Sequence, residues 1–570
     1  MTHSKLFLSL LLAGTVGSVS AQSLKDAKAA MAIEQYDKAK SMLQNLVEKK
    51  AKDGENYFYL GQIHLINDKV DSAAYVFNQG LTNAPKEQLN NVGLGIVDLM
   101  NGNASAAESK FSTAVAGLGR KDYLPLYYIG RAYINAPKPD YTKAIEYLTQ
   151  AKAKNAKDPL IPVALGDAYA GLGESSQAFV NYRDALNIDP TLLAPKIGQA
   201  IISRRAQAYD VVLEQLTKLI SENPDHAPLY RELAETYYLY SLKAPEDQYR
   251  EINSKALENY KKYLSLTGDN SVEAKTRYAD FLVYSGNYDE LKTVSQELVN
   301  MPGVDAKVYR YLGYTTYVQD KDYAKAAEYM NTLFSQVKAE RLIPRDYLYA
   351  GLANLEGGDE AKGLQYLKDG IAKQTEDDNI EAEVAETAFA KYQEGEIAYA
   401  VKIFAIPAST PESDYYYDAN YYIGLGQYSE GRKIIDGAQE GEDKRPEATP
   451  KFDAAIKAFD VVLGATKEDI REKYYASSLY HKAYSLLAKE DLGDLESLSD
   501  SFVEPFTKLL EYYEGKPIDD KNKTYILDAN NYLAVYAFSK GDNEKAKAYF
   551  DKVLSINPED EFALQFQEYL

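Results

Sequence analysis

The segment IPVALGDAYAGLGESSQAFVNYRDALNIDP, residues 161–190, decides the fold. Apolar side chains recur at helical spacing in its first part, residues 161–172, and again in its second part, residues 175–188. Gly173 lies at the break between the two parts. Pro190 ends the second part, because proline cannot continue a helix and restricts the residue before it. The segment therefore predicts two antiparallel helices joined by a short turn.

The same spacing recurs at two other places in the chain. Each set has a small residue, a second small residue 12 positions later, an aromatic residue 4 further on and a proline 8 after that. The sets are Gly61, Ala73, Phe77 and Pro85; Gly166, Ala178, Tyr182 and Pro190; and Ala534, Ala546, Phe550 and Pro558. Small residues let two helix backbones approach closely, and the aromatic ring fills the space beside them. The pattern predicts a repeated helix pair.

This pattern resembles the tetratricopeptide repeat, a helix–turn–helix of about 34 residues. The matching positions are the small residues Gly166, Ala178 and Ala185, the larger residues Leu165, Tyr169 and Tyr182, and Pro190. The tryptophan that is frequent in the first helix of this family is absent, and Tyr57, Leu126 or Pro162 takes its place. Weaker or degenerate copies fill the rest of the chain, so we expect about 13 repeats.

The resemblance implies an all-α fold, a right-handed superhelical α-solenoid with about seven or eight repeats per turn. One helix pair cannot bury its apolar stripe alone, so stacked neighbours form a continuous core. The expected organisation has four parts. They are a signal peptide at 1–21, an N-terminal repeat solenoid at 22–434, an acidic loop containing Gly and Pro at 435–450, and a C-terminal solenoid at 451–570 that continues the stack.

The first residues have the features of a secretion signal. Lys5 precedes a short apolar run, residues 6–13, and the small residues before Gln22 form a cleavage pattern that ends at Ala21. We expect a protein exported to a bacterial periplasm, free or peripheral to an envelope membrane, because a chain without cysteine needs no oxidative folding there. No later segment is long and apolar enough to span a bilayer, so no integral membrane segment is expected in the mature chain.

Composition and charge exclude several classes of function. The net charge is −21, and removal of residues 1–21 takes away one Lys and no acid, which leaves 63 − 85 = −22. A chain this acidic is repelled by phosphate backbones, so nucleic acid is not an expected partner. The absence of cysteine excludes disulfides, thiolate metal sites, a thiol nucleophile and a lipid-modified N-terminal Cys.

Motifs that would carry catalysis are also missing. His64, His226 and His481 lie far apart in sequence, and none has metal-ligand spacing. Ser335 and Lys338 match a Ser-x-x-Lys pair, but the motifs that accompany it in acyl-transfer enzymes are absent. We therefore expect no catalytic residues, no metal and no cofactor, and the chain is not expected to be an enzyme.

In the tetratricopeptide family the first helix of each pair lines a concave groove where ligands dock. Three sets of residues in this chain take the groove-facing positions: Tyr127 and Arg131; Arg231, Glu235 and Tyr238; and Arg310, Tyr314 and Tyr317. Tyr and Arg are the residue types that most often anchor protein interfaces. With 51 tyrosines in the chain, many of them must serve packing alone.

The favoured hypothesis is a scaffold or adaptor that binds other proteins of the envelope, or exported proteins, as peptides or helices in this groove. One alternative is a periplasmic module that binds a glycan or a peptide nutrient, although such modules usually expose Trp platforms. A chaperone for exported chains differs from a scaffold only in how many partners it accepts. A hydrolase with an unrecognised site is the remaining alternative.

Overall fold

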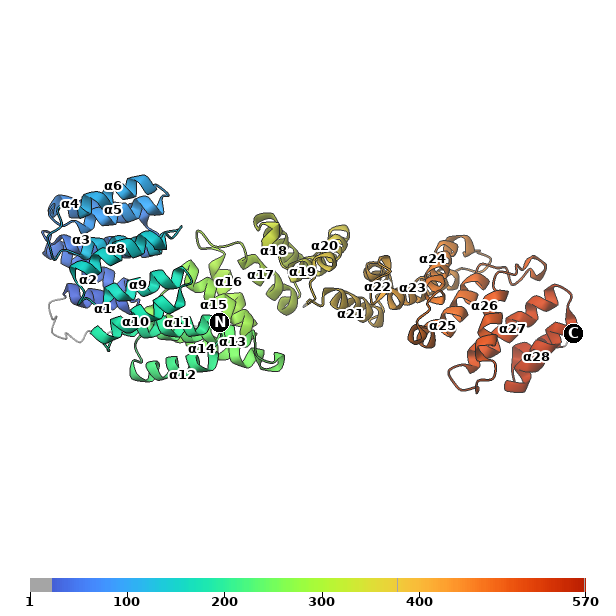
Figure 1. The fold of residues 1–570 in the computed structure, drawn as a ribbon. Helices are drawn as coiled ribbons and strands as arrows, with labels where there is room; N and C mark the ends of the chain where they lie inside the picture. Colours follow the sequence, from blue (N-terminus) through green and yellow to red (C-terminus); the bar gives the residue numbers. More distant parts are fainter. Residues whose placement is uncertain (1–22, 377, 568, 570) are drawn as a thin grey trace, which may run out of the picture. The chain divides into compact units, whose positions relative to one another are not determined.

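A computed structural model describes residues 23–376, 378–567 and 569. Helices account for all the regular structure in these residues (Figure 1). The chain divides into two compact units, one ending at Tyr311 and the other beginning at Leu312. The expected signal peptide at 1–21 lies outside the described residues. The all-α repeat solenoid expected from the sequence is confirmed.

In the first unit the helices are α1 (Leu24–Ala32), α2 (Tyr36–Lys49), α3 (Gly54–Ile66), α4 (Val70–Asn83), α5 (Leu89–Met100), α6 (Ala104–Val115), α7 (Leu124–Asn135), α8 (Tyr141–Lys154), α9 (Leu160–Gly171), α10 (Ser175–Ile188), α11 (Leu193–Arg205), α12 (Tyr209–Glu222), α13 (Ala227–Ser241), α14 (Tyr249–Thr267), α15 (Val272–Ser285) and α16 (Tyr288–Leu298). A short 3-10 helix, η1 (Glu246–Gln248), precedes α14, and α17 (Val308–Thr315) contains the boundary between the units.

In the second unit the helices are α18 (Tyr323–Gln336), α19 (Pro344–Glu356), α20 (Glu360–Lys373), α21 (Ile380–Gln393), α22 (Ile397–Phe404), α23 (Tyr416–Asp436), α24 (Arg445–Leu463), α25 (Glu468–Leu487), α26 (Val503–Tyr513), α27 (Lys523–Ser539), α28 (Asn543–Ile556) and α29 (Glu561–Gln567). A π-helical segment, η2 (Thr316–Asp320), follows α17. The 3-10 helices are η3 (Ala339–Arg341), η4 (Pro407–Ser409) and η5 (Leu495–Ser497).

Local sequence explains how each pair turns. In the segment that decides the fold, Gly173 takes a φ of +82° between α9 and α10, a backbone conformation that favours glycine. Several second helices begin after an aspartate whose side chain accepts the backbone N–H three residues later, which satisfies a donor that the helix leaves free. These caps are Asp140, Asp322, Asp359 and Asp542.

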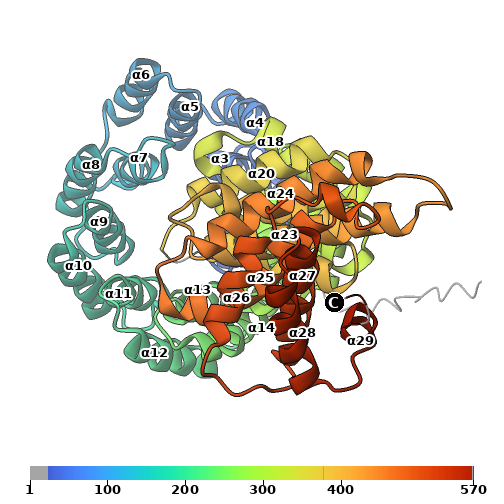
Figure 2. The ribbon, with the colours of Figure 1, turned by 90° about the vertical axis from the view of Figure 1, so that its right-hand side faces the viewer.

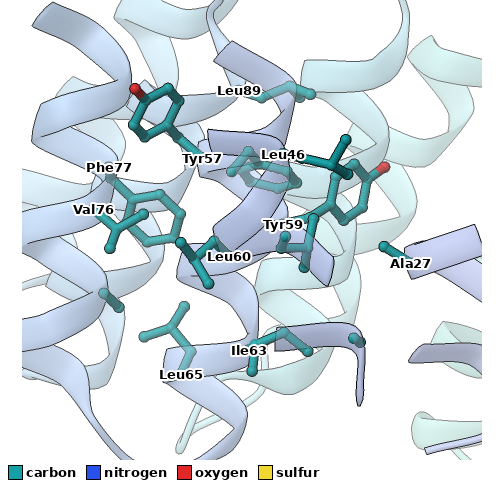
Figure 3. Packing of buried hydrophobic residues seen from close by; sticks show 14 of the residues in the cluster. Ala27, Leu46, Tyr57, Tyr59, Leu60, Ile63, Leu65, Val76, Phe77 and Leu89 are labelled. Carbon is teal, nitrogen blue, oxygen red and sulfur yellow. The ribbon is translucent and has the colours of Figure 1, made fainter. Parts of the chain in front are cut away.

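Aromatic rings pack against the small residues identified in the sequence. Phe77 of α4 is fully buried, and a Cβ atom on Gly61 of α3 would lie 2.2 Å from its ring (Figure 3). Tyr182 stands in the same relation to Gly166, at 2.4 Å, and also contacts Gly198 of the next pair. One ring thus joins its own pair to the following pair, which explains why the aromatic position recurs.

Within the first unit, the odd-numbered helices contact one another and form the inner layer. Helices α3, α5, α7, α9, α11 and α13 contact in succession, while each even-numbered helix packs on the outside of its own pair. Figure 2 shows α7, α9 and α11 on the inside of an arc, with α8, α10 and α12 outside them. We call the exposed side of the first, odd-numbered helix of each pair the inner-helix surface.

Two boundaries differ from those expected. Helix α23 continues to Asp436 and α24 begins at Arg445, so helix replaces both ends of the loop expected at 435–450. Ala448 and Phe452 are fully buried, and this burial stabilises the first turns of α24 although Pro450 lies within them. The compact units meet between Tyr311 and Leu312, so they do not coincide with the expected segments 22–434 and 451–570.

Candidate binding surface

The first set of expected site residues lies on α7 and connects it to the next inner helix. Arg131 pairs with Asp167 of α9 at 2.6 Å, and Asp167 also accepts the Tyr182 hydroxyl at 2.8 Å. Burial is the main cause that raises the pKa of Tyr127, whose ring packs edge-on against Tyr128 at 4.9 Å. Arg131 is one-third exposed, so it lies on the inner-helix surface. Its charge is already paired with that of Asp167.

On α13, all three expected residues have partners within the first unit. Arg231 pairs with Glu34 at 2.7 Å. Glu235 holds Arg277 of α15 through two hydrogen bonds of 2.7 and 2.6 Å, a bidentate geometry. Tyr238 stacks on Tyr284, with ring centroids 4.6 Å apart and an angle of 16° between the rings. These side chains link neighbouring repeats, so their type and position are explained by packing alone.

The Arg231–Glu34 pair joins the seventh helix pair to the first. Glu34 lies in the turn between α1 and α2, with a φ of +61°, and it also accepts the Tyr263 hydroxyl of α14 at 2.9 Å. Gln35 in the same turn donates to the carbonyl of Leu266 at 3.2 Å. Seven pairs, α1/α2 to α13/α14, thus close one turn of the solenoid. Sequence analysis missed this closure, because no short-range pattern marks a contact between residues 197 positions apart.

The third set lies on α17 and η2. Tyr314 packs edge-on against Tyr349 of α19 at 4.8 Å, and Tyr317 lies 5.8 Å from the same ring. Arg310 is on α17, one turn before Tyr314. The three sets therefore occupy three separate inner helices and do not form one compact site.

A second group of inner tyrosines lies on α23, α25 and α27. Tyr421 stacks on Tyr474 and Tyr480 stacks on Tyr525, both at 4.2 Å, so rings continue from one helix to the next. Tyr484 packs on Tyr480 at 4.6 Å. We call Tyr421, Tyr428, Tyr480, Tyr484, Tyr525 and Tyr532 the tyrosine face. All six are half-buried.

Sequence reasoning missed the tyrosine face although the signal was present. Tyr127 and Arg131 lie three positions before and one after the small residue Gly130. Tyr480 and Tyr484 lie at the same steps from Ala483. The repeat pattern is degenerate in residues 415–463 and 466–515, so the sequence predicts no binding positions there. The same steps from each small residue of a first helix do locate Tyr480 and Tyr484.

Asp528 of α27 lies within the tyrosine face. Its Oδ2 atom accepts the hydroxyls of Tyr480 and Tyr484, both at 2.7 Å. Burial first, and Asp528 second, raise the pKa of both hydroxyls, so they stay protonated and donate to the carboxylate. His481, on the same helix as the two tyrosines, has its pKa lowered by burial.

The part of the chain that the structure describes holds no group of three or more His, Asp or Glu side chains placed to bind a metal ion. Ser335 donates its hydroxyl to the carbonyl of Thr332, which accounts for it as an ordinary helix residue. A pocket of about 540 Å³ between the start of α23 and the start of α25 is lined mainly by charged side chains, among them Asp418, Lys467 and Lys473. No helix in the described ranges is long and apolar enough to cross a membrane.

Comparison with known proteins gives the family. The tetratricopeptide repeat profile matches residues 24–87, and a second profile of the same repeat matches residues 527–560. The chain therefore contains tetratricopeptide repeats. The two matched regions include α1 to α4 at one end and the α27/α28 pair at the other. A search of curated protein sequences finds no significant match.

Several solved structures are similar to this tetratricopeptide-repeat protein at low identity. The C-terminal part of a repeat protein from Cytophaga hutchinsonii is 20% identical over 51% of this chain and 98% of its own, with a TM-score of 0.27. A tetratricopeptide repeat protein from Parabacteroides merdae is 19% identical over 46% of this chain and 97% of its own, with a TM-score of 0.30. Yeast Tom70 is 11% identical over 72% and 96%, with a TM-score of 0.28. Likenesses this weak carry no inference about function.

Proposed function

We propose that this protein is a non-catalytic scaffold or adaptor of the bacterial cell envelope that binds partner peptides or helices along its inner-helix surface. The repeats support the general role, because stacked helix pairs present extended surfaces suited to binding other proteins. The observation that carries the proposal is the tyrosine face on three consecutive inner helices. Half-buried aromatic side chains with polar ends are suited to protein interfaces, since they give large contact area at small entropic cost.

Export to the envelope is the part of the proposal that rests on sequence alone. Lys5, the apolar run at 6–13 and the cleavage pattern ending at Ala21 support it. Fractionation of cells that make the full chain, followed by intact-mass measurement, tests it. We expect the protein in the periplasmic fraction with Gln22 as its first residue. An unprocessed chain in the cytoplasm would contradict export.

Crosslinking in intact cells and purification of the chain test the scaffold role. A scaffold is expected to bring down a small and reproducible set of envelope proteins. Many unfolded or nascent exported chains would indicate a chaperone instead. A glycan or short peptide without any protein partner would indicate a ligand-binding module, and either outcome would reject the scaffold.

A further inference from the structure

The carboxylate of Asp528 has an incomplete set of partners. Both tyrosine hydroxyls bond to Oδ2, and Oδ1 accepts no hydrogen bond from the described residues. No Lys, Arg or His within the described ranges lies within 4.0 Å of either oxygen. Burial raises the pKa of Tyr532, and the positive charge of Arg432 acts against this rise. The Arg432 guanidinium itself pairs with Asp436 at 2.8 Å. Asp528 is thus half-buried and accepts two hydrogen bonds, and a cation beside it would add the opposite charge.

Other carboxylates of this chain also accept a tyrosine hydroxyl, and each of them has a further partner. In five cases it is a Lys or Arg: Glu34 with Arg231, Asp167 with Arg131, Asp280 with Lys307, Glu290 with Lys261 and Asp418 with Lys473. In a sixth case, Asp158 accepts the backbone N–H of Leu160. Asp528 accepts tyrosine hydroxyls as these five carboxylates do, but it lacks their Lys or Arg partner.

Arg231 shows how a cation fits such a site. Its guanidinium lies 2.7 Å from Glu34 and 5.5 Å from the centroid of the Tyr263 ring, while the Tyr263 hydroxyl bonds to the same carboxylate. Carboxylate and aromatic face thus act on one guanidinium together. Asp528 accepts two tyrosine hydroxyls, those of Tyr480 and Tyr484, and the Tyr525 ring stacks on Tyr480.

We propose that Asp528, with Tyr480 and Tyr484, binds the cationic side chain of a Lys or Arg from a partner protein. The occupant is a basic, extended segment, because the carboxylate supplies the complementary charge and the rings continue onto α23 and α27 on either side. This inference rests on the proposed scaffold function and assigns the chemistry of one anchor within it.

A peptide titration tests the site. Since the chain has no cysteine, Thr524→Cys on the exposed side of α27 accepts a single fluorine label one turn before Asp528. The labelled protein is titrated with a peptide of alternating Gly and Arg, and with the same peptide carrying citrulline, which is neutral and has the shape of arginine. We expect the arginine peptide to shift the fluorine resonance and to bind at least about tenfold more tightly than the citrulline peptide.

Two variants locate the effect. Asp528→Asn keeps an oxygen that accepts the tyrosine hydroxyls and should remove the preference for arginine. Glu544→Gln removes an exposed charge from the outer helix α28 and should leave the preference unchanged. Equal binding of both peptides to the natural chain, or an arginine preference that survives in Asp528→Asn, would overturn the proposal. Because this titration needs no cellular partner, its failure is distinguishable from failure of the scaffold role in cells.

Discussion

At the scale of single residues, Gly166 shows why the helix crossings need glycine. A Cβ atom there would lie 2.4 Å from the Tyr182 ring, a distance that real side chains do not occupy. We expect Gly166→Ala to destabilise the protein by up to about 2 kcal/mol, because overpacking costs about 1–3 kcal/mol and outweighs a gain of about 1 kcal/mol in helix propensity. Thermal unfolding followed by circular dichroism measures the change.

Gly464 provides the matched control for this substitution. It ends α24 with a φ of −74°, and the nearest atoms to a Cβ there lie at 3.4 Å, an ordinary contact distance. Gly464→Ala should change stability by less than about 0.5 kcal/mol. If both variants melt at the same temperature, the close approach at Gly166 does not determine the packing of the repeat.

His481 makes stability depend on pH. Burial lowers its pKa below the ordinary value of 6.5, and its Nδ1 lies 2.8 Å from the carbonyl of Ser477. The unfolded chain therefore binds the proton more readily than the folded chain, so stability is lost as the pH falls below about 6.5. We expect the melting temperature to fall between about pH 7.5 and pH 5.5. The fall should be smaller in His481→Phe, and an equal fall in both proteins would exclude His481 as the cause.

Residue types on the inner-helix surface could be predicted, but their partners could not. Arg131, Glu235 and Tyr314 each follow a small residue by one position, and all three lie on first helices as expected. Sequence alone does not show that Arg131 meets Asp167 or that Glu235 meets Arg277, because those pairs depend on how successive repeats rotate. The sequence therefore predicts which helices carry these residues. It does not predict which of their charges are already paired within the chain.

At the scale of elements, the turn between α1 and α2 closes the first solenoid turn. Glu34 of this turn is 15% exposed and Arg231 is 35% exposed, so their pair is sheltered from solvent more than a surface ion pair is. We expect Arg231→Gln to loosen the first helix pair and to increase amide hydrogen exchange in α1 and α2 about tenfold. Hydrogen exchange measured by mass spectrometry resolves these helices.

Glu251→Gln is the control for this loosening. Glu251 pairs with Lys255 on the same helix, and the two side chains are 72% and 51% exposed. Removal of such a pair should leave exchange in α1 and α2 unchanged, since exposed pairs within one helix contribute little. Unchanged exchange in Arg231→Gln as well would show that apolar packing alone holds the first pair in place.

Most elements could be predicted from the sequence, and the exceptions have physical causes. Helix pairs with small, aromatic and proline positions were recognised, and the count of about 13 repeats came close to the 14 pairs from α1/α2 to α27/α28. The start of α24 was expected to be loop because of its prolines, whereas burial of Phe452 stabilises helix there.

At the scale of the whole molecule, both units are built from helix pairs, and the first helix of a pair carries the candidate binding residues of the inner-helix surface. They include the residues expected on α7 and α13 in the first unit, and Tyr314, Tyr317 and the tyrosine face in the second. A scaffold that uses this surface should contact its partners from inner helices and not from outer ones. This is the central claim about the protein, and side chains on the two layers allow a direct comparison.

Site-specific photo-crosslinking in cells tests this claim most directly. p-Benzoylphenylalanine replaces an aromatic residue at two inner positions, Tyr127 and Tyr525, and at two outer positions, Tyr75 and Phe179, which are 64% and 45% exposed. We predict discrete crosslinked proteins from one or both inner positions and none from the outer positions. Crosslinks from the outer positions alone, or from no position, would contradict binding along the inner-helix surface.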